Sequence, residues 1–239
     1  MAQKIKDIIL DILFPRFCFG CGVEGVYLCE DCEATIEISE YKYCLCNENN
    51  LRIPEQSKKG KCKKCNSKKL SGLYSSLSYK EKPLTKKLIY FFKYPPYYLK
   101  DLAKPLASLI INHILLLNEN PFKNSVLIPV PLDKKKIKQR GYNQSEELAK
   151  EISKATGVPF LTNVLIKTKS TPPQMELSKE KRRENLRDVF VCKESNAIGN
   201  KKILLVDDVY TTGSTMEECA TKLLKSGAKE VWGIVIARD

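Results

Sequence analysis

Two adjacent carboxylates near the C-terminus follow a short apolar run, and small hydroxyl residues come directly after them. Residues 203–206 are Ile-Leu-Leu-Val, and Asp207 and Asp208 follow. Four successive apolar residues predict a strand buried on both faces, as in a parallel sheet. The turn after the acids consists largely of small residues, namely Thr211, Thr212, Gly213, Ser214 and Thr215. Between a strand and a helix, such a turn can bind phosphate through backbone N–H groups and the helix dipole.

The acid pair limits what can lie beside that phosphate. Two neighbouring carboxylates can accept hydrogen bonds from two ribose hydroxyls, or hold a metal ion through water. An apolar stripe at helical spacing over residues 216–224, and a strand-like run over 231–237, complete one βαβ unit. The sequence has neither the Gly-Lys-Ser/Thr of a P-loop nor a G-x-G-x-x-G after a strand. A helix-capping aspartate would explain one carboxylate, but not two with a hydroxyl-rich turn. We therefore expect a ribose-phosphate site.

The pattern resembles the signature of type I phosphoribosyltransferases, which bind 5-phosphoribosyl-1-pyrophosphate (PRPP): an apolar strand, two acids and Thr-Thr-Gly-x-Thr. Two further segments resemble the ComF family of competence-associated proteins. The first comprises residues 127–132, Lys136 and residues 139–145; the second comprises Thr171, Gln174, Leu177, Arg183, Asn185, Leu186, Arg187 and Phe190. With the cysteine-rich N-terminal part, the resemblance covers nearly the whole chain.

The resemblance implies an α/β fold, with a Rossmann-like parallel sheet of the type I phosphoribosyltransferase kind and an N-terminal cysteine-rich zinc-ribbon module. It also implies roles for the residues above. Asp207 and Asp208 would bind the ribose, residues 211–215 the 5′-phosphate, and Arg140 the pyrophosphate together with Mg²⁺. Catalysis would be electrostatic, through stabilisation of the departing pyrophosphate, and would need no side-chain nucleophile.

Residues 167–187 are rich in charge and lack a sustained core pattern before Leu186. In related transferases a loop at this position closes over PRPP and excludes water. Gln174, Arg183 and Arg187 are therefore candidate lid contacts. The alternative for this segment is a surface helix that begins near Ser178.

Eight of the ten cysteines form four close pairs in the N-terminal part of the chain. The pairs are Cys18 and Cys21, Cys29 and Cys32, Cys44 and Cys46, and Cys62 and Cys65. Repeated pairs at this spacing are typical of zinc sites, because two pairs complete a tetrahedron of thiolates. We expect one zinc ion on the first four cysteines and one on the last four. A single residue separates Cys44 from Cys46, where the ComF family usually has two.

The remaining sequence divides into an N-terminal amphipathic helix (1–15), a zinc-ribbon module (16–70) and a phosphoribosyltransferase-like domain (71–239). Within that domain we expect a hood at about 71–120 and a core at about 121–239. Helices are predicted at 84–92, 99–117 and 145–154, and a strand at 126–130. The basic residues before the last helix are predicted to form a loop; they are Lys134, Lys135, Lys136, Lys138 and Arg140.

Several single residues are expected to be structural. His113 is the only histidine and lies on a mostly apolar predicted helix, so a histidine-dependent catalytic site has little support. Cys192 and Cys219 are expected to be core thiols. The aromatic and basic residues of 90–100 either pack within the hood or stack unpaired bases.

The balance of 41 Lys and Arg against 28 Asp and Glu gives a net charge of +13, which favours a polyanionic partner. No apolar run approaches membrane-spanning length, and Asp7 and Asp11 interrupt any signal-peptide core. We expect a cytoplasmic protein, whose N-terminal helix either docks on the chain or lies at the inner face of the membrane.

Two functional hypotheses follow. The first is a PRPP-binding ComF-type protein that supports uptake or handling of single-stranded DNA in natural transformation, in contact with DNA or with DNA-uptake proteins. The second is a small-molecule phosphoribosyltransferase of nucleotide metabolism whose zinc module is structural. The PRPP site is argued from the residues themselves, whereas the DNA role comes from the family resemblance alone.

Overall fold

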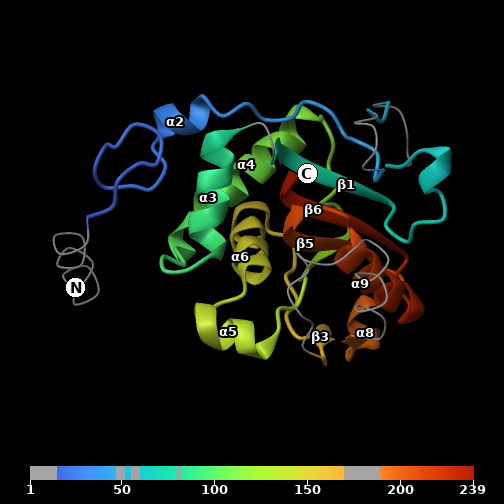
Figure 1. Cartoon of the computed structure of the whole chain (residues 1–239). Coiled ribbons are helices and arrows are strands. Elements are labelled where there is room, and N and C mark those ends of the chain that lie inside the picture. Colours follow the sequence, from blue (N-terminus) through green and yellow to red (C-terminus); the bar gives the residue numbers. More distant parts are fainter. Residues whose placement is uncertain (1–14, 47–51, 55–59, 80–81, 170–188) are drawn as a thin grey trace.

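The computed structural model describes residues 15–46, 52–54, 60–79, 82–169 and 189–239. At its centre, the described strands form a parallel sheet in the order β1-β6-β5-β2 (Figure 1). These strands are β1 (Gly72–Ser78), β2 (Ser125–Pro129), β5 (Lys202–Tyr210) and β6 (Glu230–Arg238). A separate antiparallel pair joins β3 (Leu165–Lys167) to β4 (Phe190–Cys192).

The sheet is covered on both faces, which is why its strands read as continuous apolar runs. One face packs against α3 (Pro83–Lys93), α4 (Ala103–Leu116) and α6 (Gln144–Thr156). The other face packs against α9 (Ser214–Lys225), α8 (Ser195–Ile198) and the second cysteine segment. Figure 1 shows the first three helices on one side of the sheet and α8 and α9 on the other.

Strand β5 is longer than the sequence predicts. Its pairing with β6 continues through Asp207, opposite Val235, to Tyr210, opposite Arg238. The acid pair therefore lies within the paired part of β5 and not beyond its end. The backbone on both sides of the carboxylates is fixed by hydrogen bonds to β6. The following helix and strand, α9 and β6, lie where the sequence predicts them.

The basic segment between β2 and α6 was predicted to be a loop, and this prediction was wrong. It forms the helix α5 (Lys134–Arg140). The Asp133 carboxylate caps the N-terminus by accepting a hydrogen bond from the Lys135 N–H at 2.8 Å, and Gly141 ends the helix with φ of 81°. Both are ordinary helix boundary signals, and they outweigh the mutual repulsion of the lysines.

Strand β1 comes from the segment expected to form the hood, yet it pairs in parallel with β6 in the main sheet. Its outer edge is covered by the linker after the first cysteine segment, where the Ser39 N–H donates to the Ser76 carbonyl at 2.8 Å. The buried side chain of His113 supports this linker, because its Nδ1 lies 2.6 Å from the Ser39 carbonyl oxygen. His113 thus has the structural role expected for it.

The other structural expectations can be followed along the chain. Cys219 is fully buried in α9, and Cys192 is half-buried in β4. Along the parts of the chain that the structure describes, no helix combines the length and the apolar character that crossing a bilayer requires. The predicted N-terminal helix falls almost entirely in residues 1–14, which lie outside the described residues. The lid candidates Gln174, Arg183 and Arg187 also lie outside the described residues.

The packing of β1 on β6 depends on a glycine. A Cβ at Gly72 would lie 2.3 Å from Cζ3 of Trp232 and 2.8 Å from the Cα of Gly60. We expect Gly72→Ala to lower the free energy of unfolding by about 1–3 kcal/mol, because the indole ring and a second backbone must both move. Urea unfolding measures this change. Gly199→Ala is the matched control, since its Cβ would meet nothing nearer than 3.9 Å; equal losses in both variants would contradict the packing argument.

Candidate active site and metal centres

The first carboxylate of the acid pair is fixed by the N-terminal turn of α6. Asp207 Oδ1 accepts a hydrogen bond from Ser145 Oγ at 2.9 Å and another from the Asp208 N–H at 2.9 Å. Asn143, two residues before Ser145, caps α6 and donates from Nδ2 to the Val130 carbonyl at 3.0 Å. The ends of β2 and β5 and the start of α6 therefore meet around Asp207.

The second carboxylate forms an ion pair with the last residue of α3. Lys93 Nζ lies 2.9 Å from Asp208 Oδ1 and 2.8 Å from Oδ2. Burial alone would lower the pKa of Lys93, but the Asp208 charge raises it, so this lysine stays charged. Sequence reasoning missed the pair, because the only local signal was a lysine at the end of a predicted helix.

The pKa of the Asp207 carboxyl is strongly raised. Burial and, next, the negative charge of the neighbouring Asp208 together bring it from the ordinary value of 3.8 to about 7. The Lys93 charge and the hydrogen bonds to Asp207 act in the opposite direction. Asp208 forms the ion pair with Lys93, and the raised pKa of Asp207 lies near neutral pH.

The hydroxyl-rich turn lies directly at the N-terminus of α9, as predicted. Gly213 occupies the N-cap position with φ of 74°, a left-handed conformation that favours glycine. The hydroxyls of Thr212 and Ser214 lie 3.0 Å apart beside it. A Cβ at Gly213 would meet the Tyr210 hydroxyl at 2.3 Å, so the glycine is required by the space as well as by the backbone. We call residues 211–215 the phosphate loop.

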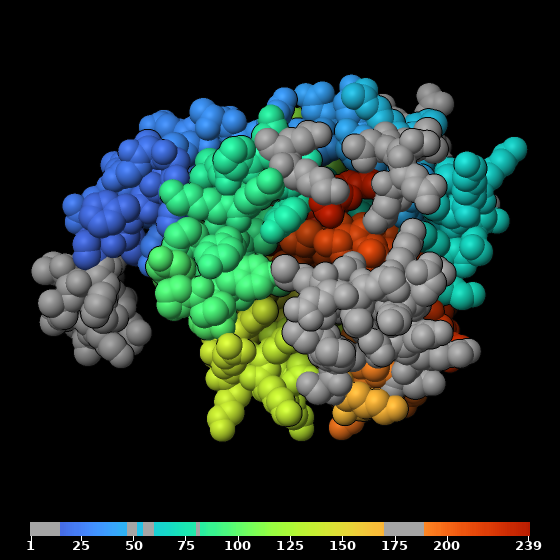
Figure 2. Space-filling view, viewed as in Figure 1, coloured from blue at the N-terminus to red at the C-terminus, as the bar shows by residue number. Residues whose placement is uncertain are grey.

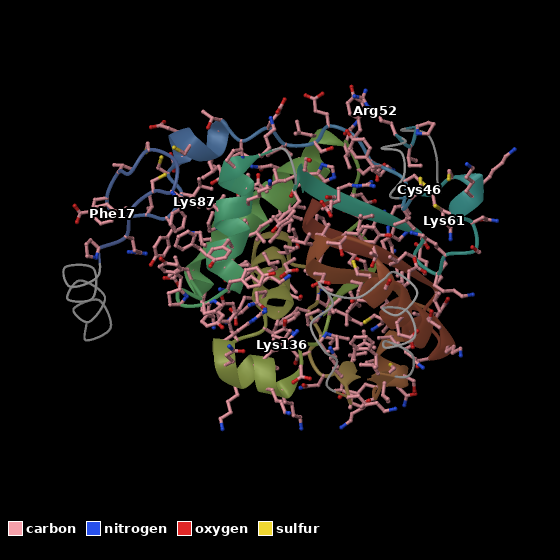
Figure 3. The ribbon with its side chains drawn as sticks, in the orientation of Figure 1. Phe17, Cys46, Arg52, Lys61, Lys87 and Lys136 are labelled. Carbon is pink, nitrogen blue, oxygen red and sulfur yellow. The ribbon has the colours of Figure 1, made fainter. Side chains whose placement is uncertain are left out.

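A group of cations lies near the acid pair. Lys136 is half-buried on the side of α5 that faces the body of the molecule (Figure 3). Burial lowers the pKa of Lys136, and the charges of Arg140 and Lys93 lower it further, which indicates that the three cations share one region. Figure 2 shows the ends of the C-terminal strands at the floor of a hollow between the α3 region and the second cysteine segment.

The first cysteine group lies at the far end of the molecule, near Phe17 (Figure 3), and includes α2 (Glu30–Ala34). The four sulfur atoms of Cys18, Cys21, Cys29 and Cys32 lie within 4.8 Å of one another. Backbone N–H groups of Gly20 and Cys29 point at the Cys18 sulfur, each at 3.4 Å. Burial would raise the pKa of Cys18, but backbone N–H groups, that of Cys21 first and then those of Cys29 and Gly20, lower it to about 6. Such donors are typical of thiolates that bind a metal.

The second cysteine group lies against the sheet. The sulfur atoms of Cys44, Cys46, Cys62 and Cys65 also lie within 4.8 Å of one another, and the Cys62 N–H donates to the Cys44 sulfur at 3.1 Å. The short spacing of Cys44 and Cys46 does not prevent the four sulfurs from meeting. Both groups of four follow sequence order, as predicted, and each could hold a metal ion.

Comparison with protein families adds an independent observation. Residues 115–239 match the model of the family described as "Phosphoribosyl transferase domain", which is more than half of the chain. The chain belongs to this family. The parallel sheet with helices on both faces and the N-terminal cysteine groups confirm the predicted fold class.

Curated relatives of this phosphoribosyl transferase domain protein carry competence names. Competence protein F of Haemophilus influenzae is 40% identical over 114 residues, 46% of this chain and 50% of the relative. DNA utilization protein YhgH of Salmonella typhi is 30% identical over 137 residues, 55% of this chain and 59% of the relative. Competence protein ComFC of Bacillus subtilis is 36% identical over 109 residues, 45% of this chain and 41% of the relative. The chain thus spans about half the length of these relatives, and their names confirm the ComF resemblance.

Among solved structures, the glutamine PRPP amidotransferase from B. subtilis, complexed with ADP and GMP, matches with 23% identity and a TM-score of 0.36. The match covers 57% of this chain and 25% of that chain.

The raised pKa of Asp207 predicts a pH-dependent cost to folding. In the unfolded chain this carboxyl titrates near 3.8, so the folded state loses stability as the pH rises from about 4 to about 7. We expect Asp207→Asn, which cannot ionise, to raise the melting temperature at pH 8 by on the order of 5 °C, and much less at pH 4. Scanning calorimetry at the two pH values measures this. Glu151→Gln on the surface of α6 is the control; a gain at pH 4 as large as that at pH 8 would contradict the assignment.

Proposed function

We propose that this protein binds PRPP at the carboxyl end of β5, and that the acid pair together with the glycine-capped phosphate loop forms the binding site. Asp207 and Asp208 bind the ribose hydroxyls. The backbone N–H groups and hydroxyls of residues 211–215 bind the 5′-phosphate, because the first turn of a helix offers N–H groups without intrahelical partners. The observation that carries the proposal is the acid pair within the last four residues of β5, a strand that leads through the phosphate loop into the N-terminus of α9.

The pyrophosphate of PRPP lies on the cationic side of the site in this proposal. Arg140, the residue expected for this role, is joined there by Lys93 and Lys136. Carboxylate and phosphate oxygens are the ligands that Mg²⁺ prefers, so Mg²⁺ fits between the acid pair and the pyrophosphate. Catalysis would then rest on stabilising the charge of the departing pyrophosphate, with Asp207, Asp208 and Arg140 as the catalytic residues. Gln174, Arg183 and Arg187 remain predicted lid contacts.

Each cysteine group binds one zinc ion in this proposal. Four sulfurs within 4.8 Å of one another suit the tetrahedral coordination that structural zinc takes with four thiolates. The N–H groups directed at the Cys18 and Cys44 sulfurs support this reading, since they stabilise thiolate charge.

The protein acts, we propose, in the handling of single-stranded DNA. The names of its relatives, competence protein and DNA utilization protein, point to this role. The net charge of +13 supports a polyanionic partner. In addition, Tyr90 and Tyr97 are about half exposed and extend a cluster of rings around Phe91, beside Lys87 and Lys93. Exposed aromatic faces beside cations can stack unpaired bases of any sequence.

The PRPP site is tested by isothermal titration calorimetry with PRPP and Mg²⁺. We expect the wild type to bind, and Asp207→Asn/Asp208→Asn to bind at least about tenfold more weakly, because each acid supplies charge-assisted hydrogen bonds to the ribose. Glu151→Gln should bind as the wild type does, since the ion pair of Glu151 within the described residues is with Lys154, its neighbour on α6. A folded wild type that releases no heat with PRPP would rule the proposal out.

The DNA proposal is tested by fluorescence anisotropy with a labelled oligothymidine at several salt concentrations. We expect binding that weakens steeply with salt, and a further loss of about tenfold in Tyr90→Ala/Tyr97→Ala, because base stacking on an aromatic ring contributes about 1–3 kcal/mol. Leu115→Ala/Leu116→Ala, two exposed apolar residues at the end of α4, is the control. Turnover of PRPP with a free base, without affinity for the oligonucleotide, would instead favour the small-molecule transferase hypothesis.

A further inference from the structure

The phosphate loop is joined to the second cysteine group through one side chain. Tyr210 is the last residue of β5 and directly precedes the loop, and its ring is almost fully buried. Its hydroxyl donates to the Leu45 carbonyl at 3.2 Å and accepts a hydrogen bond from Lys68 Nζ at 3.0 Å. Lys68 Nζ donates to the same carbonyl. Leu45 lies between Cys44 and Cys46, so the tyrosine contacts the backbone of the cysteine group itself.

A second side chain from the sheet binds the same short segment. Arg238, at the end of β6, donates from Nη1 to the Cys44 carbonyl at 3.0 Å and from Nη2 to the Cys46 carbonyl at 3.1 Å. Arg238 is the strand partner of Tyr210. Three successive carbonyls, those of residues 44, 45 and 46, are therefore bound by neighbouring side chains at the carboxyl edge of the sheet.

The other side of the loop is attached to the same module. Glu217, in the first turn of α9, accepts hydrogen bonds from the Lys69 N–H at 2.7 Å and the Leu70 N–H at 3.4 Å, just after Cys65. On the loop side, the Tyr210 ring lies so close to Gly213 that a Cβ there would meet the ring carbon Cζ at 2.4 Å. The ring thus fills the space between the cysteine group and the left-handed glycine of the phosphate loop.

The first cysteine group is attached to a different part of the molecule. It packs on α3, where Phe19 contacts Phe91 with ring centroids 4.4 Å apart and Lys87 lies over the Phe19 ring. The same four-cysteine chemistry is therefore present twice in one molecule, once against the helical layer and once against the phosphate loop. The first group serves as an internal control for the second.

We propose that metal binding at the second cysteine group and PRPP binding at the phosphate loop stabilise each other, with Tyr210 as the positioning residue between them. The proposal rests on the proposed PRPP site. A metal ion on Cys44, Cys46, Cys62 and Cys65 fixes the backbone of residues 44–46, which fixes the Tyr210 hydroxyl, which in turn fixes the ring beneath Gly213. Occupancy of this metal site then regulates the affinity for PRPP.

The physical reason is the cost of unpaired polar groups. A structural zinc site takes its local fold from the metal, so residues 44–46 lose their fixed path when the metal leaves. The buried Tyr210 hydroxyl and the Arg238 guanidinium would then lose the carbonyls that they bind, and a buried donor without an acceptor is costly. The tyrosine would shift, and Gly213 with it. By linkage, the factor by which metal loss weakens PRPP binding equals the factor by which bound PRPP strengthens metal binding.

The reciprocal effect can be measured without any assay of activity. In the full-length Cys21→Ala/Cys32→Ala variant, only the second group still offers four cysteine ligands to a zinc ion. The zinc affinity of this variant is measured by competition with a chromophoric chelator. We expect PRPP with Mg²⁺ to tighten zinc binding about five- to tenfold, within the range usual for coupled sites. In the mirror variant, Cys46→Ala/Cys62→Ala, the first group should bind one zinc with an affinity that PRPP does not change.

A subtler pair of variants keeps both cysteine groups intact. Tyr210→Phe preserves the buried ring but removes the hydroxyl that contacts Leu45 and Lys68, and it should reduce the PRPP-induced shift in zinc affinity to less than about twofold. Tyr74→Phe is the control: its buried hydroxyl on the same sheet binds Glu119 at 2.8 Å and contacts neither the loop nor a cysteine group. This control should retain the full shift.

The outcomes separate the coupling from the PRPP site itself. If calorimetry shows PRPP binding to the wild type while zinc affinity at the second group does not change, the coupling is overturned and the site stands. A shift that persists in Tyr210→Phe would overturn the role of the tyrosine. If the wild type binds no PRPP, both proposals are overturned together. Should the cysteine variants fail to fold, the comparison of Tyr210→Phe with Tyr74→Phe still decides the question, because both retain all eight ligands.

Discussion

The ion pair between Lys93 and Asp208 is the interaction on which the candidate site depends. Two adjacent carboxylates near the end of a buried strand repel each other, and Lys93 places a cation within 3 Å of one of them. The cation comes from the last residue of α3, so this helix must end at the carboxyl edge of the sheet. The buried Tyr142 hydroxyl donates to the Phe92 carbonyl, which anchors that last turn. The helical layer is therefore part of the site and does more than cover the sheet.

The first carboxylate of the pair, Asp207, is less well stabilised than its neighbour. Asp207 accepts hydrogen bonds from Ser145 Oγ and the Asp208 N–H, but no ion pair joins it to a cation among the described residues, and burial beside Asp208 raises its pKa to about 7. Strongly shifted acids of this kind are concentrated at binding sites, because a ligand or metal ion can supply the missing partner. The fold tolerates an acid that it does not fully stabilise, and in the proposed site a bound ligand would supply the missing stabilisation. Stability and binding are thus opposed at this one residue.

The sequence predicted the local parts of this structure and missed the long-range ones. The βαβ unit around Gly213 and the two groups of four cysteines are encoded within short spans, by apolar runs, turn residues and spacing. The Lys93 to Asp208 pair joins residues 115 positions apart, and the Tyr210 to Leu45 contact joins residues 165 positions apart. No pattern within a short stretch of sequence indicates such pairs. The loop predicted at Lys134–Arg140 is different, because the cap at Asp133 and the stop at Gly141 were present in the sequence, and the lysine run was given too much weight.

The two cysteine groups have the same four ligands but are attached to the rest of the molecule in different ways. The first is attached by aromatic contacts to a helix, and such contacts tolerate small movements because they have little directional requirement. The second is attached by hydrogen bonds from Tyr210 and Arg238 to its own backbone carbonyls, and hydrogen bonds weaken steeply with misalignment. A shift of the first group can be absorbed by the rings around Phe91. A shift of the second group must be passed to the ends of β5 and β6, where the acid pair and the phosphate loop begin.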